Sequence, residues 1–156
     1  MQNRTFFVTS VTWQRHSIFQ NHVLARELLS TMYDYRAAGK LQLHEFVIMP
    51  DHVHLILTPA ATLTLERAMH LIKGGFSRRV GKSRPNLMIW EKSFTNHRIR
   101  DERDYRQHCE YIHQNPIRKF LVQTAEEFPY SSACPGFVLD PSPFAVAAPE
   151  GAFLVD

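Results

Sequence analysis

The amino-acid sequence predicts an α+β fold in which helices pack on one face of an antiparallel sheet. Segments whose apolar and polar residues alternate, as in strands, are interspersed with longer segments whose apolar residues recur at helical spacing. Two of the strand-like segments are separated by a turn signal alone, so we expect them to pair as a hairpin between two helices. The order strand, helix, strand, strand, helix, strand, helix favours a ferredoxin-like arrangement.

Four segments are rich in the β-branched and aromatic residues that strands prefer. The turn signal between the two hairpin strands is Pro50-Asp51. We expect the strands at residues 6–15, 41–49, 52–58 and 94–99.

Three segments repeat apolar residues at the spacing that places them on one helix face. Asn21 opens the first helical pattern, Thr62 or Thr64 can cap the second helix, and Asp101 starts the third. Gly39 is a suitable stop for the first helix, and the second runs to about Val80. Asn115-Pro116 is expected to end the third helix, because proline lacks an amide donor and restricts the residue before it.

The composition places the chain among ordinary globular domains, with 156 residues of which 44% are hydrophobic and 21% charged. No apolar run reaches the roughly 20 residues of a membrane-spanning helix, and the N-terminus has no signal-peptide pattern. Cys109 and Cys134 are too few for a disulfide scaffold. These features exclude a secreted mini-protein and a membrane protein, and they predict a cytoplasmic protein without a membrane partner.

Positive charge is concentrated in the middle of the chain, although the formal net charge is only +3. Residues 67–106 contain eleven Lys and Arg against four Asp and Glu, whereas residues 120–156 contain five acids and no base. Such an excess predicts a polyanionic partner, most often a nucleic acid. The alternative is a solvated helix face.

The basic segment 73–84 mixes cations with small residues and one aromatic, a composition that suits phosphate contacts and stacking. The alternative is a solvated helix end, where cations also interact favourably with the helix dipole. Two further arginines alternate on the expected last strand, so they would share one face. The candidate DNA-binding residues are Lys73, Arg78, Arg79, Lys82, Arg84, Arg98 and Arg100.

His52 and His54 are two residues apart on an expected strand, so both side chains point to the same face of the sheet. Two neutral imidazoles on one face can chelate a divalent metal, but a carboxylate, an amide or water must complete the site. The alternative is a pair of half-exposed strand residues with hydrogen-bonded rings.

Tyr111 and Asn115 are four residues apart on an expected helix and are therefore neighbours on one helix face. A phenol is a weak nucleophile toward a phosphodiester and needs a metal to polarise the phosphate. The amide oxygen of Asn115 can serve as a metal ligand, and His108 could replace it or act as a base. The alternative is a half-buried tyrosine with Asn115 as a helix cap.

Two segments together resemble a known family: residues 49–56, which read MPDHVHLI, and residues 111–118, which read YIHQNPIR. Their combination resembles the single-tyrosine HUH transposases of the insertion-sequence 200-like type. It looks closest to the subgroup of REP-associated tyrosine transposases, as do Lys73-Gly74 and the run from Phe128 to Ser132. The chain departs from the family pattern at Lys119-Phe120, where the family often has a small residue and glycine.

The resemblance implies an HUH endonuclease fold over residues 1–134, followed by a proline-rich C-terminal tail at 135–156. It implies that His52 and His54 bind Mg²⁺ or Mn²⁺ with Asn115 as third ligand, and that Tyr111 is the nucleophile. Family members cleave single-stranded DNA, often recognised as a hairpin, form a 5′-phosphotyrosine, and rejoin the strand in DNA transposition or REP-element mobilisation. The resemblance also implies a monomer or a homodimer. Both arrangements occur among HUH transposases, so Tyr111 can serve its own chain or a partner's.

Three other interpretations stay open. A histidine-triad nucleotide hydrolase would need a third alternating histidine, where this chain has Ile56. A domesticated relative could bind hairpin DNA without cleaving it. A structural α+β protein could carry these motifs by chance. A covalent protein–DNA adduct separates the transposase from all three.

Overall fold

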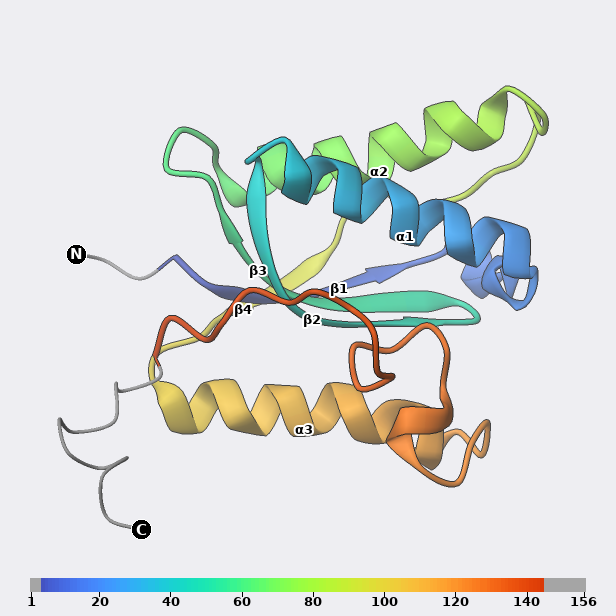
Figure 1. The fold of residues 1–156 in the computed structure, drawn as a ribbon. Helices are drawn as coiled ribbons and strands as arrows, with labels where there is room; N and C mark the ends of the chain where they lie inside the picture. Colours follow the sequence, from blue (N-terminus) through green and yellow to red (C-terminus); the bar gives the residue numbers. More distant parts are fainter. Residues whose placement is uncertain (1–3, 145–156) are drawn as a thin grey trace, which may run out of the picture.

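Within residues 4–144, which the computed structural model describes, a four-stranded antiparallel sheet separates layers of helix (Figure 1). The strand order across the sheet is β2-β3-β1-β4. The strands are β1 (Phe6–Val11), β2 (Leu41–Met49), β3 (His52–Pro59) and β4 (Thr95–Arg98). The α-helices are α1 (His22–Ala37), α2 (Leu65–Gly81) and α3 (Glu102–Arg118).

The predicted α+β class is confirmed, and the hairpin forms between β2 and β3 as expected. The expectation that helices cover one face holds for α1 and α2, whereas α3 lies against the opposite face (Figure 1). The reason is that β2 and β3 are buried on both faces, with nearly unbroken apolar runs at 46–49 and 55–57. A strand of that kind needs cover on both sides.

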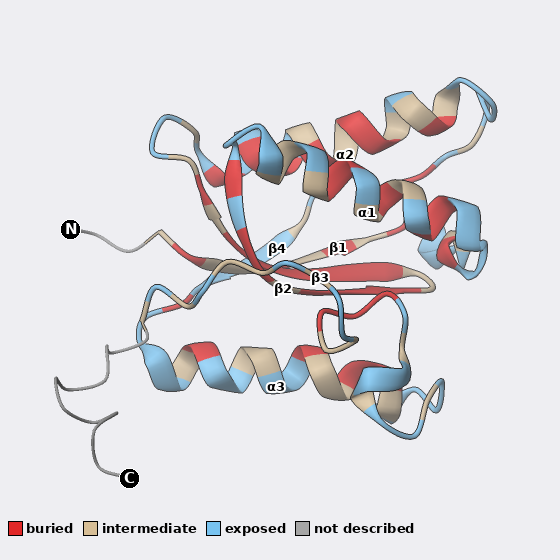
Figure 2. Cartoon of the chain, viewed as in Figure 1, coloured by how far each residue is buried: buried red, intermediate tan, exposed pale blue. Residues whose placement is uncertain are grey.

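Two hydrophobic clusters lie on the two sides of the sheet, and buried residues line both of its faces (Figure 2). The larger cluster joins the sheet to α1 and α2 and includes Leu28, Phe46 and Phe76. The smaller one lies under α3 and consists of Val47, Met49, Ile56, Ile99, Tyr105 and Ile112. The smaller cluster fixes α3 over the sheet face that carries the two predicted histidines.

The expected helix starts are confirmed, and each has a side-chain cap. The side chains of Asn21, Thr64 and Asp101 each accept a hydrogen bond from a backbone N–H of the first turn that follows. Thr64, rather than Thr62, caps the second helix.

The prediction that Asn115-Pro116 ends the third helix is wrong, because α3 continues through Pro116 to Arg118. Proline so close to the C-terminus removes a single amide donor, which is a small loss in the last turn. The helix then stops in a Schellman motif, in which Leu121 N–H bonds to the Pro116 carbonyl and Phe120 N–H to the Ile117 carbonyl. Phe120 has a φ of 60° there, the left-handed conformation that favours glycine.

Two strand predictions need correction. The first strand ends at Val11 instead of residue 15, because residues 13–15 form a 3-10 turn in which Gln14 and Arg15 have positive φ. The last strand ends at Arg98, so Arg100 lies beyond it and does not share a strand face with Arg98.

The described part of the predicted tail, residues 135–144, packs against β2. The Asp140 carboxylate forms an ion pair with Arg36 at 2.9 Å and accepts a hydrogen bond from Leu43 N at 2.8 Å. Phe137 lies edge-on to Phe46, with ring centroids 5.0 Å apart. The boundary at residue 134 stays a prediction, and residues 145–156 of the tail lie outside the described residues.

Candidate active site

The site forms where β1 and β3 face α3. His52 and His54 point to this face of β3, as the spacing predicts, with ring centroids 4.7 Å apart. They are buried, at 8% and 4% exposure, instead of half-exposed as the alternative interpretation requires. Phe7 of β1 stacks on the His54 ring with centroids 5.2 Å apart and completes the floor of the site.

Hydrogen bonds orient both imidazole rings. His54 Nδ1 lies 2.8 Å from Thr9 Oγ1, and His52 Nδ1 lies 2.7 Å from Asp51 Oδ1. Arg15 in turn donates to Asp51 Oδ2 at 3.3 Å. A carboxylate on Nδ1 fixes the His52 tautomer that leaves a lone pair on Nε2, which is how metal-binding histidines are usually held.

The environment keeps both histidines neutral near pH 7. Burial lowers the pKa of His54 to about 3, aided by the charge of His52 when that ring is protonated and by the charge of Arg118. Burial also lowers the pKa of His52, although the hydrogen bond and charge of Asp51 oppose the shift. For Asp51, burial acts to raise the pKa, but the hydrogen bonds and charges of His52 and Arg15 together outweigh it and the pKa is lowered. A neutral imidazole is the form that binds a metal.

Two buried atoms of the predicted ligands lack a hydrogen-bond partner. In the described part of the chain, the buried side-chain polar atoms without a partner are Ser10 Oγ, His54 Nε2 and Asn115 Oδ1. Native proteins satisfy nearly all such atoms, so each exception needs an explanation. A cation would satisfy the imidazole nitrogen and the amide oxygen, and both donors suit Mn²⁺ or a partly hydrated Mg²⁺. The residues therefore fit a divalent metal.

Tyr111 lies directly beside these ligands on α3. Its ring centroid is 5.3 Å from that of His54 and 5.9 Å from that of Phe7, both in edge-to-face geometry. The guanidinium carbon of Arg118 is 4.4 Å from the centre of the phenol ring. Tyr111 remains 43% exposed, so an incoming strand can reach it. The arrangement combines an accessible phenol, a cation above its ring and a pair of neutral imidazoles.

Sequence reasoning missed four residues of this site: Asp51, Thr9, Phe7 and Arg118. Asp51 directly precedes His52, so the sequence could have indicated a carboxylate beside this imidazole. Asp51 was instead interpreted only as part of the turn between the two strands. Thr9 and Phe7 reach the site only because β1 pairs with β3, a pairing that local sequence does not specify.

His108, the candidate replacement for Asn115, belongs to a different group of side chains. Its Nδ1 lies 2.8 Å from the Asp104 carbonyl oxygen and 3.0 Å from the Asp104 carboxylate. Its ring packs against Phe7, with centroids 4.7 Å apart.

The predicted DNA-binding residues of the basic segment lie on or just after α2, and α2 covers the sheet face opposite Tyr111 (Figure 1). Two of these cations are engaged within the chain. Lys73 Nζ donates to the Glu91 carbonyl at 3.0 Å, and Arg79 bonds to Thr31 and Asp34 of α1. The structure therefore does not gather them at the tyrosine.

The other predicted DNA-binding residues are exposed. Arg78, Lys82 and Arg84 lie toward the C-terminal end of α2. Arg98 is the last residue of β4, and Arg100 lies in the link from β4 to α3, the helix that carries Tyr111. Contacts of all these residues with DNA stay a prediction.

The sheet, its two histidines and the tyrosine-bearing helix across them define a class of protein, the single-tyrosine transposases. A family model described as "Transposase IS200 like" matches residues 2–115, and the chain belongs to this family. A relative from Escherichia coli (strain K12), named "REP-associated tyrosine transposase", is 26% identical over 138 residues, covering 83% of this chain and 80% of the relative. The resemblance inferred from the two motifs is confirmed.

A solved structure has the same fold. It is described as "Structure of the REP associates tyrosine transposase bound to a REP hairpin" and superposes with a TM-score of 0.73 at 24% identity. The match covers 95% of this chain and 94% of that one. Between residues 4 and 144, no helix combines the length and apolar character needed to cross a membrane.

Proposed function

We propose that this chain cleaves and rejoins single-stranded DNA through a 5′-phosphotyrosine at Tyr111, with Mg²⁺ or Mn²⁺ held by His52, His54 and Asn115. One observation carries the proposal: the unpaired buried atoms His54 Nε2 and Asn115 Oδ1 belong to residues beside an accessible tyrosine. Within residues 4–144, two of the three buried side-chain polar atoms without a partner belong to the predicted ligands, and chance motifs in a structural protein do not account for that coincidence.

The reaction exchanges one phosphodiester for another. The Tyr111 hydroxyl loses its proton and its oxygen attacks the phosphorus, while the bond from phosphorus to the 3′-oxygen breaks and that oxygen gains a proton. The products are a tyrosine linked to the 5′-phosphate and a free 3′-hydroxyl, so reversal rejoins a strand without ATP. When bound, the metal supplies charge neutralisation at the phosphate.

The side chains around Tyr111 have separate tasks in this scheme. His54 and Phe7 pack edge-on against the phenol and hold it beside the ligands. Arg118, over the ring, provides positive charge where the tyrosine oxygen and the phosphate meet. Asp51 and Thr9 hold the two imidazoles in orientation.

The substrate we propose is a hairpin with a single-stranded flank, used in transposition or REP-element mobilisation. The name of the relative and the hairpin in the description of the solved structure support this choice. The exposed cations Arg78, Lys82 and Arg84 would contact phosphates of the duplex part, and such contacts fix position without reading sequence.

The test is a cleavage assay with end-labelled hairpin DNA taken from beside the chain's own gene, in Mn²⁺, on a denaturing gel. We expect a slow, protease-sensitive covalent band that disappears with EDTA and in Tyr111→Phe. That variant should still bind the hairpin on a native gel. Tyr35→Phe, a change of the same chemistry on α1, serves as the matched control and should retain the adduct.

Variants of the ligands test the metal site separately. His52→Ala and His54→Ala should lose Mn²⁺-dependent cleavage while still binding the hairpin. Tight binding by the unaltered chain without any adduct would instead identify a domesticated hairpin-binding protein. Wild-type cleavage by both histidine variants in the presence of chelator would refute the metal site.

A further inference from the structure

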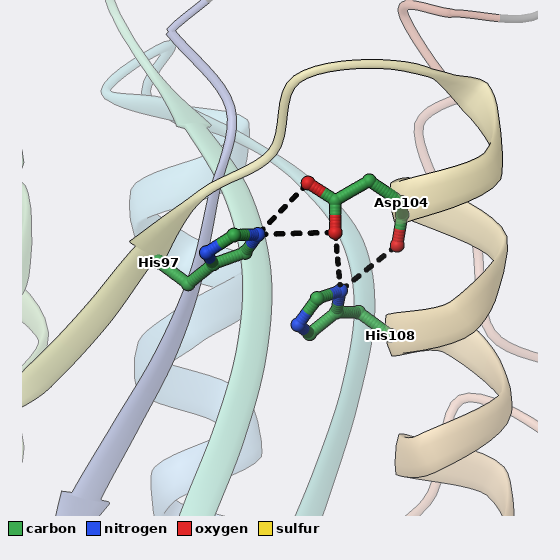
Figure 3. Close-up of side chains that lie close together, drawn as sticks. All are labelled: His97, Asp104 and His108. Atoms are coloured by element: carbon green, nitrogen blue, oxygen red, sulfur yellow. Dashed lines mark hydrogen bonds and ion pairs between the residues drawn. The ribbon is translucent and has the colours of Figure 1, made fainter.

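A second group of potential ligands lies outside the proposed active site. His97 on β4 and Asp104 and His108 on α3 turn toward one another (Figure 3). We refer to these three residues as the β4–α3 cluster. One ligand atom from each residue lies within 4.8 Å of the ligand atoms of the other two. Among the described side chains, this is the group of at least three His, Cys, Asp or Glu residues with that spacing.

Asp104 is the centre of the cluster. His97 Nε2 lies 2.8 and 3.0 Å from its two carboxylate oxygens, and His108 Nδ1 lies 3.0 Å from Oδ1. The backbone N–H of Arg100 donates to Oδ2 at 3.0 Å, which holds the carboxylate in place. The imidazoles of His97 and His108 stack with centroids 4.7 Å apart, so both rings present a nitrogen to the same carboxylate.

We propose that the β4–α3 cluster is a second divalent-cation site, selective for a transition metal of the Zn²⁺ class and separate from the site of His52, His54 and Asn115. Two imidazole nitrogens and one carboxylate oxygen are a set that Zn²⁺ binds, with water in the fourth position. Mg²⁺ prefers a shell of oxygens, so it would favour this donor set less.

The spacing of the ligands is close to what such a site requires. Ligands about 2.0 to 2.1 Å from a tetrahedral Zn²⁺ are roughly 3.3 Å from one another. The observed separations from each imidazole nitrogen to the Asp104 carboxylate are 2.8 to 3.0 Å, so each nitrogen needs to move from the carboxylate by only a few tenths of an ångström. All three ligand atoms already lie within 4.8 Å of one another. A metal would take the lone pair of the nitrogen nearest Asp104 on each ring, with the ring proton on the other nitrogen.

The cluster is accessible and joins two elements. The His97 side chain is 44% exposed, which gives a cation a path from solvent. A cation there would fasten the edge strand β4 to the early turns of α3, the helix on which Tyr111 follows His108 by three residues. Phe7 contacts a residue of each site, because its ring packs against both His108 and His54.

The test measures Zn²⁺ binding to the folded protein by isothermal titration calorimetry, with no DNA present. The double variant His52→Ala/His54→Ala removes the first site, so any remaining Zn²⁺ belongs to the cluster. We expect about one Zn²⁺ per chain in this variant. Adding His97→Ala should weaken that binding by at least about tenfold, and His70→Ala, at an exposed histidine of α2, should leave it unchanged.

A second comparison does not depend on the buried histidines. His97 is exposed on an edge strand, so His97→Ala alone should fold, and it should remove one Zn²⁺ equivalent from the otherwise unaltered chain. Absence of Zn²⁺ binding in the double variant, or equal losses in His97→Ala and His70→Ala, would overturn the inference. The readout is metal binding alone, so it neither requires nor refutes the proposed cleavage at Tyr111.

Discussion

The buried imidazole of His54 makes a defined prediction about stability in acid. Its pKa in the folded protein is about 3, whereas an unfolded histidine has a value near 6.5. The folded state therefore favours the neutral ring. The stability that this contributes is present above about pH 6.5 and is lost as the pH falls from there toward 3.

The magnitude follows from the two pKa values. At pH 5 the unfolded chain has gained a proton on His54 and the folded chain has not. Because pH 5 is about 1.5 units below the unfolded pKa of 6.5, this proton lowers the unfolding free energy by about 2 kcal/mol. His44 and His52 also have pKa values lowered by burial, so they add to the total loss in acid.

The assay is urea unfolding in EDTA at pH 7.5 and pH 5, followed by circular dichroism, for the unaltered chain and for His54→Asn. Asparagine can keep the hydrogen bond to Thr9 but does not titrate. The loss of stability on acidification should be about 2 kcal/mol smaller in the variant, and comparing losses cancels the contributions of the other histidines. His70→Asn, at an exposed position, should behave like the unaltered chain. Equal losses in all three proteins would refute the buried, neutral His54.

Three substitutions around α3 test its packing, its end and its chemistry. Ile112→Ala removes a fully buried side chain from the cluster beneath α3 and should cost about 2 to 5 kcal/mol in urea unfolding. Unchanged stability would contradict the packing. Phe120→Gly relieves the left-handed φ of 60° at a 94% exposed position and should stabilise the chain by about 1 kcal/mol in the same assay. A loss of stability would argue against that helix end. Arg118→Ala should slow single-turnover cleavage about tenfold without weakening hairpin binding, and an unchanged rate would remove this cation from the reaction.

The parts of the fold that depend on local patterns could be predicted. The turn signal at Pro50-Asp51 gave the hairpin, and strand alternation put His52 and His54 on one face. Asparagine, threonine and aspartate caps marked the helix starts, because a side-chain acceptor is needed wherever the first turn exposes its N–H groups.

One error arose where distant segments decide the outcome, and another arose at a local helix end. The apolar runs of β2 and β3 indicate burial on both faces, but which helix covers the second face depends on how the strands are ordered. Proline was expected to end α3 at Asn115-Pro116, yet the Schellman motif around Phe120 ends it after Arg118.

In the candidate site, too, some features follow from local sequence patterns and others depend on segments far away in the sequence. Tyr111 and Asn115 follow from helical spacing, but Tyr111 is exposed and Asn115 is buried, and only packing against the sheet determines that difference. The contact between Thr9 and His54 depends on the register of β1 with β3. Among the predicted basic residues, Arg79 pairs with Asp34 of α1, a partner far away in sequence.

The central claim is that Tyr111 becomes covalently linked to the 5′-phosphate of a cleaved strand. The most direct measurement is mass spectrometry of the protein after reaction with a short hairpin in Mn²⁺, nuclease trimming and proteolysis. The account predicts a nucleotide attached through its 5′-phosphate to Tyr111, and no such peptide when EDTA is present. A nucleotide attached to a different residue, or attached to Tyr111 through a 3′-phosphate, would contradict it.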